Sequence, residues 1–228
     1  MTKGMDMKQV VMAAAVAALS ALGATASSAA PITLDTIADG VVGNTDGPVF
    51  VSTAGTNLSL ITWPTTAILG VFEFDLSGIA DDSTILSAAF GFTLGIGSFS
   101  FYSPIEFTVD AYLGNGVVDV ADFTALGSTV ITSSVASGLA AGTTLSFDLS
   151  SLVPVQDALA GNLLTLRLSL TNQEQLNIAA IESTAYGNAT LTLDAEAAPP
   201  PSPVPLPAGL PLLLAGLGAL GLLRRRRP

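Results

Sequence analysis

The chain has 228 residues, a formal net charge of −11 at pH 7, and neither cysteine nor histidine. Without cysteine it has no disulfides, thiol nucleophile or thiolate metal site, and without histidine it has no His-based triad or ordinary zinc site. Between Ala30 and Pro207 the single cation is Arg167, set against seventeen acidic residues, so this span carries a formal charge of −16. Such an acidic surface repels phosphate backbones, and we expect no nucleic-acid partner and no enzymatic activity.

Residues 1–26 predict a secretory signal peptide. Lys3 and Lys8 form a positive start, an apolar run extends from Val10 to Leu22, and Ala24-Thr25-Ala26 gives a cleavage site with small residues. The alternative is an N-terminal membrane anchor, but the apolar run is short for a span of about 20 residues. We therefore expect export, with the mature chain outside the cytosol.

Residues 31–194 show apolar residues at every second position, the pattern of half-buried β-strands. The clearest stripes are Phe72, Phe74 and Leu76; Leu86, Ala88, Phe90, Phe92 and Leu94; Ile105, Phe107, Val109, Ala111 and Leu113; Leu145, Phe147 and Leu149; Leu164, Leu166, Leu168 and Leu170; and Leu191 and Leu193. Weaker strands are expected at 32–37, 49–53, 58–62, 126–132 and 176–181, and one short helix at 155–160 after Pro154. These stripes predict an all-β domain, an antiparallel, jelly-roll-like β-sandwich with a single core.

Part of this domain is similar to a known group of extracellular bacterial modules. The run Val71–Ile79 (VFEFDLSGI) followed by Ser83–Phe90 (STILSAAF) resembles the opening of DNRLRE-type sandwich modules. Residues 112–129 and 145–149 are similar to the later strands of the same group. The resemblance implies a jelly roll related to carbohydrate-binding modules, but it identifies no binding residue.

The segment from Asn115 to Asp122 is similar to the second half of a calcium-binding loop. With Gly116 at the sixth position of such a loop, Asn115, Asp119 and Asp122 take the fifth, ninth and twelfth positions. The first and third positions are then Ala111 and Leu113, whose side chains cannot bind calcium. A hairpin loop is therefore the favoured interpretation, with a weak calcium site at Asn115, Asp119 and Asp122 as the alternative. We expect no other cofactor.

Two further groups of residues bear on function. Glu73 and Asp75 share the outward face of one predicted strand, and Asp81 and Asp82 lie in a turn, so a carboxylate-only polysaccharide-degrading enzyme is the least favoured hypothesis. Trp63 is the only tryptophan and is the candidate for stacking on a sugar ring. A carbohydrate-binding module is therefore the alternative function.

The C-terminus has three consecutive parts. Residues 195–203 form a proline-rich linker, Val204, Pro205, Leu206, Pro207 and Ala208 follow, and an uncharged apolar stretch runs from Gly209 to Leu223 before Arg224, Arg225, Arg226 and Arg227. The stretch predicts a short transmembrane helix, helped by snorkelling arginines. Each arginine costs about 2.5 kcal/mol or more at the bilayer centre, so the cluster should stop translocation and stay cytoplasmic.

Residues 204–228 together resemble the VPLPA variant of the PEP-CTERM sorting signal, and the five-residue motif matches at every position. The resemblance implies that an exosortase-type membrane protease recognises the tail and that the domain is passed from the inner membrane to the cell surface or the medium. Proteins with this signal are typical of Gram-negative bacteria that make exopolysaccharide and biofilm. The alternative is an ordinary single-span tail anchor. We expect a non-catalytic surface or matrix protein, associated with exopolysaccharide.

Overall fold

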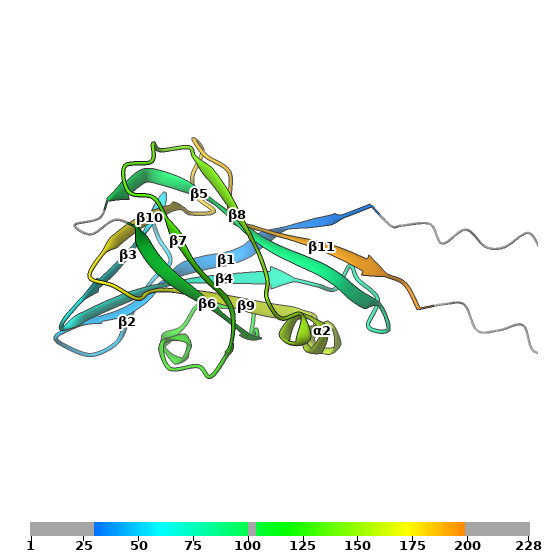
Figure 1. Ribbon diagram of the computed structural model, residues 1–228. Coiled ribbons are helices and arrows are strands. Elements are labelled where there is room, and N and C mark those ends of the chain that lie inside the picture. The colour runs from blue at the N-terminus through cyan, green and yellow to red at the C-terminus, as the bar shows by residue number, and fades with distance from the viewer. Residues whose placement is uncertain (1–29, 100–103, 199–228) are drawn as a thin grey trace, which may run out of the picture. The chain divides into compact units, whose positions relative to one another are not determined.

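The structure is a computed structural model that describes residues 30–99 and 104–198 (Figure 1). The predicted signal peptide, sorting motif and arginine cluster lie outside the described residues. Within them the chain is all-β, as the alternating pattern predicts, with eleven strands and one short α-helix. No helix of the described part has the length and apolar character needed to span a lipid bilayer.

Every predicted strand segment overlaps an observed strand. The strands are β1 (Ile32–Thr45), β2 (Phe50–Ser52), β3 (Asn57–Trp63), β4 (Thr66–Asp75), β5 (Thr84–Phe99), β6 (Ile105–Leu113), β7 (Ser128–Val135), β8 (Thr144–Asp148), β9 (Leu163–Leu170), β10 (Gln175–Ala179) and β11 (Thr190–Glu196). The predicted helix is α2 (Val153–Ala158), which continues into the 3₁₀ turn η2 (Leu159–Gly161). A 3₁₀ turn that we did not predict, η1 (Val120–Phe123), lies between β6 and β7.

Six of the strands close into a ring. The pairing follows β1-β11-β5-β10-β3-β4, and β4 also pairs with β1, which completes the circuit. Strands β9, β6 and β7 extend the sheet beyond β4, and β8 pairs with β5. The ring is possible because β1 and β5 are long and each pairs with different neighbours in its two halves.

Aromatic side chains join the layers of the main core. Phe90 on β5 lies 5.3 Å from Phe72 on β4 between ring centroids, and Phe92 lies 6.2 Å from Phe107 on β6 in an edge-to-face arrangement. Phe147 on β8 lies 5.1 Å from Phe107, again edge to face. These separations are those of favourable aromatic pairs. Strands β5 and β8 therefore pack face to face with β4 and β6.

Two predicted core residues are wrongly assigned: Leu113, which is 62% exposed at the end of β6, and Leu86. Leu86 is 57% exposed, while its neighbour Ile85 is 5% exposed and belongs to the core. The pairing of β5 with β11 shifts register between Asp194 and Ala195, where Leu86 is the extra residue on β5. Because side chains alternate across a strand, one extra residue in this β-bulge reverses the faces beyond it.

The second half of β1 extends eight residues past the predicted strand end at Ile37. Apolar and polar residues do not alternate there, because apolar clusters of the protein cover both faces of the strand: Val41 packs on the main core and Val42 on a second cluster. Val42 and Val71 are fully buried in a second, smaller cluster outside the main core. Gly43 lies so close to β4 that a Cβ there would come within 2.6 Å of the carbonyl oxygen of Ala67, so glycine is required for the pairing.

The two ends of the domain lie side by side. Ile32 at the start of β1 is paired with Leu193 on β11, in an antiparallel arrangement (Figure 1). Strand β11 reaches Glu196, two residues beyond the predicted end of the domain. The described chain therefore begins and ends at one edge of the ring.

Candidate functional site

A loop folds back over the outer face of the sheet and closes the second cluster. We call residues Gly114–Gly127, between β6 and β7, the cap loop. Val118 of this loop is 9% exposed and packs with Val42 and Val71, and Phe123 is partly buried against the same cluster. The outer faces of β1 and β4 are therefore covered by protein rather than by water.

The single cation of the domain, Arg167 on β9, holds this loop in place. Its Nη1 donates to the carbonyl oxygens of Asp122 at 2.8 Å, Phe123 at 3.3 Å and Ala125 at 3.0 Å. Its Nη2 forms an ion pair with Asp110 on β6 at 2.9 Å, in side chains that are 12% and 18% exposed. A guanidinium group can make this set of bonds because its donors lie in a planar fork.

The predicted calcium residues lie together in the cap loop, where they bond to the loop itself. Asp119 Oδ1 accepts from the N–H of Ala121 at 2.7 Å, and its Oδ2 accepts from Asn115 Nδ2 at 3.2 Å. Asp122 Oδ2 accepts from the N–H of Asp119 at 2.8 Å, and its Oδ1 accepts from Tyr112 Oη at 2.9 Å. Asp119 and Asp122 thus form the capping box of η1.

These bonds define what a cation would have to displace. All four carboxylate oxygens of Asp119 and Asp122 already accept a hydrogen bond, and Asp122 is only 4% exposed. Among the described residues no group of three or more acidic side chains is placed to hold a metal ion. Weak calcium binding at Asn115, Asp119 and Asp122 stays a prediction.

Glu73 is not on a solvated surface, contrary to our expectation. The residue is fully buried on β4 because the cap loop covers that face of the strand. Its Oε1 accepts from Thr165 Oγ1 at 2.6 Å, and a Cβ at Gly114 would overlap Oε2. Burial raises the pKa of Glu73. The hydroxyl of Thr165 and the nearby N–H groups of Gly116 and Asn115 lower that pKa in part. Oε2 itself has no hydrogen-bond partner among the described residues.

The other carboxylates considered for catalysis lie elsewhere. Asp75 is exposed at the end of β4, where its Oδ1 accepts from the N–H of Ser77 at 2.8 Å, and bonds from Ser77 lower its pKa. Asp81 and Asp82 are exposed in the turn before β5. Glu73 and Asp75 therefore do not form a solvent-accessible pair, although they leave the strand on the same face.

Trp63 ends β3 at the tight connection to β4. Its side chain is 39% exposed, so part of the indole ring is open to solvent. Trp63 is not among the residues that line the pocket between the cap loop and α2 described below.

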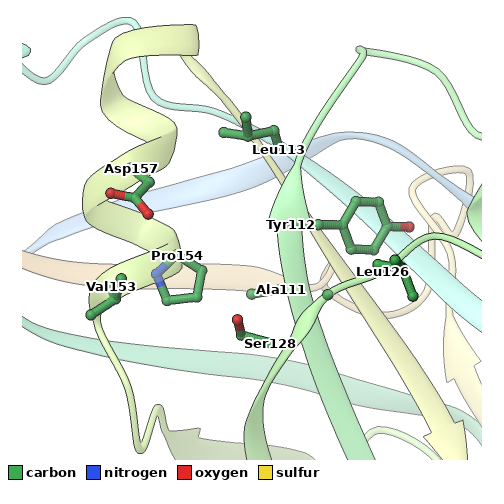
Figure 2. A pocket seen from close by; sticks show the side chains of 9 residues that line it. Ala111, Tyr112, Leu113, Leu126, Ser128, Val153, Pro154 and Asp157 are labelled. Atoms are coloured by element: carbon green, nitrogen blue, oxygen red, sulfur yellow. The ribbon is translucent and has the colours of Figure 1, made fainter.

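A pocket that the sequence analysis did not identify lies between the cap loop and α2. It has a volume of about 330 Å³ and is lined mainly by apolar groups, among them Leu113, Leu126, Val153 and Pro154. Figure 2 shows α2 along one wall, with Leu113 projecting from the end of β6 opposite and Ala111 and Ser128 between them. Its residues come from three separate segments, at 111–113, 126–128 and 153–157. In the sequence, no pattern connects these segments to one another.

Asp39 on β1 is another buried carboxylate. It is 2% exposed; its Oδ2 accepts from the N–H of Ile181 at 2.8 Å, while Oδ1 has no hydrogen-bond partner within the described residues. Burial is the main cause that raises the pKa of Asp39 to about 6, and the charge of Glu182 adds to it. An ionised Asp39 therefore costs free energy at neutral pH.

Comparison with known proteins does not assign a family. No family model matches the chain, and no curated protein matches it.

We predict that Asp39→Asn removes one pH-dependent part of the stability. Asp39 titrates near 3.8 when unfolded and at about 6 when folded, so between these pH values the folded state holds the extra proton. The free energy of unfolding therefore falls as pH rises from about 4 to about 6, by roughly 3 kcal/mol for this one group. Urea unfolding at pH 4, 5, 6 and 7 should show that the free energy of unfolding of Asp39→Asn rises relative to that of the wild type as pH rises.

The matched control is Asp35→Asn, an exposed carboxylate on the same strand. This variant should keep the pH dependence of the wild type. If Asp39→Asn follows the wild-type curve in parallel over the whole range, Asp39 is not the group that titrates there.

Proposed function

We propose that the chain is an exported, non-catalytic protein of the cell surface or extracellular matrix, sorted through an exosortase-type C-terminal signal. The observation that carries this proposal is the order of features at the end of the sequence. Val204–Ala208 precede the uncharged stretch to Leu223, and Arg224–Arg227 close the chain. An apolar stretch followed by a basic cluster is the arrangement that stops translocation with the arginines inside.

The described domain is compatible with this role. Its first and last strands pair with each other, with Ile32 opposite Leu193, so the described domain is closed without any residue of the predicted sorting signal. We also infer that the sheets form a jelly-roll-type sandwich of the DNRLRE kind. The contacts of Phe90 with Phe72 and of Phe92 with Phe107, which join strand β5 to β4 and β6, support this arrangement.

The sorting proposal predicts that Pro205→Ala with Pro207→Ala blocks processing. In a bacterium that carries an exosortase, the wild-type chain should lose its tail and reach the outer surface or the medium. The double variant should accumulate in the inner membrane at full length, because the protease no longer recognises the motif. An epitope placed before residue 30 but after the signal peptide allows both forms to be followed by immunoblotting of cell fractions.

The control is Pro199→Ala with Pro201→Ala, in the linker immediately before the motif. These changes should leave processing as in the wild type, and deletion of the exosortase gene should reproduce the motif variant. Normal processing of the motif variant, or recovery of the full-length chain as a soluble cytosolic protein, contradicts the proposal.

A carbohydrate-binding module is the second candidate function, and the partial exposure of Trp63 favours it. An exposed indole face can stack on the apolar face of a sugar ring. Electrophoresis of the purified protein through gels that contain the secreted polysaccharide should then show retardation that Trp63→Ala abolishes. Equal mobility of both proteins with and without polysaccharide removes this candidate.

A further inference from the structure

The pocket between the cap loop and α2 exposes apolar side chains that a folded domain normally covers. Within the described residues eight large apolar side chains are exposed, and three of them, Leu113 at 62%, Leu126 at 97% and Val153 at 64%, line this one pocket. Single exposed apolar residues are ordinary, but three that line one hollow offer a shared apolar surface to another molecule.

Both walls of the pocket are fixed by polar bonds. Leu126 follows directly after Ala125, whose carbonyl oxygen Arg167 holds at 3.0 Å, so the cap loop cannot bury Leu126 by folding inward. On the other wall, Gln156 of α2 donates to the carbonyl oxygen of Ser83 at 2.8 Å and accepts from the N–H of Ile85 at 2.9 Å. A pocket with walls held in this way binds a partner with little loss of conformational freedom.

The charge around the pocket selects the partner. Asp157 lies on α2 among the lining residues and is exposed to solvent (Figure 2). The only cation between Ala30 and Pro207, Arg167, is already bonded to Asp110 and to the cap loop. No cation of the domain therefore competes for Asp157, which is left to pair with a cation of a partner.

The same charge argues against other occupants. A second copy of the domain would be repelled, because each copy carries a formal charge of −16 between Ala30 and Pro207. Nucleic acid and anionic lipid would be repelled in the same way, since electrostatic complementarity suppresses partners of like charge. A partner that combines apolar side chains with lysine or arginine satisfies both the pocket and the carboxylate.

We propose that this pocket docks a basic, apolar segment of another protein. An aliphatic side chain of that segment enters between Leu113, Leu126 and Val153, and a neighbouring lysine or arginine pairs with Asp157. This site does not depend on the route by which the chain is exported.

The test uses the full chain in nanodiscs of zwitterionic phosphatidylcholine and two fluorescein-labelled peptides. One peptide alternates leucine with lysine, and the other alternates leucine with glutamate; fluorescence anisotropy measures binding, and the signal of empty nanodiscs is subtracted. The basic peptide should bind, with an affinity that falls as salt is added, and the acidic peptide should not. Leu126→Ser combined with Asp157→Asn should weaken the binding of the basic peptide by about tenfold or more.

The matched control combines Leu86→Ser with Asp82→Asn, which removes an exposed leucine and an exposed aspartate elsewhere on the domain. Its affinity should stay within about twofold of the wild type, as expected for exposed positions outside a site. Equal weakening in the two double variants, or none in either, overturns the proposal. Equal binding of the acidic peptide, or dimers of the wild type that Leu126→Ser disperses in sedimentation, also overturns it, the latter in favour of a second copy.

Discussion

The cap loop, which covers the outer face of the sheet, depends on the hydrogen bonds and the ion pair of the Arg167 guanidinium group. Arg167 is the single cation among seventeen acidic residues, and it makes one ion pair with Asp110 and three bonds to cap-loop carbonyls. Removing one partner of a fully buried ion pair costs about 3–5 kcal/mol because the other charge is left uncompensated, and this part-buried pair costs less because water reaches it. No second cation lies between Ala30 and Pro207 to replace it.

Several features follow from the loop that Arg167 holds. The loop buries Val118 against Val42 and Val71, it excludes water from Glu73, and it presents Leu126 at the rim of the pocket. The second apolar cluster, the raised pKa of one carboxylate and the outline of the pocket thus have a common origin. The second cluster and Glu73 lie on the face of β4 opposite the aromatic core, whereas the pocket also includes Ala111, which belongs to the main core.

Much of the fold could be predicted from the sequence, because alternation with a period of two depends only on which side of a strand meets the core. The strands and the short helix lie where that pattern places them. The pattern fails at Leu86, where a bulge inserts a residue, at Leu113, where β6 ends, and at Glu73, where a distant loop covers the outward face. Asn115, Asp119 and Asp122 lie together in one loop, but their hydrogen bonds within that loop could not be foreseen from the sequence. The pocket joins segments whose proximity is set by the packing of α2 on β6.

The role of Arg167 is tested most directly by amide hydrogen exchange in the cap loop, measured residue by residue in the wild type and in Arg167→Met. We expect the N–H groups of Val118, Asp119 and Asp122 to be protected in the wild type, and to exchange much faster in Arg167→Met while β4 and β9 keep their protection. If the loop exchanges in the wild type as fast as the exposed turn at Asp81 and Asp82, or stays protected without the guanidinium group, Arg167 does not hold it.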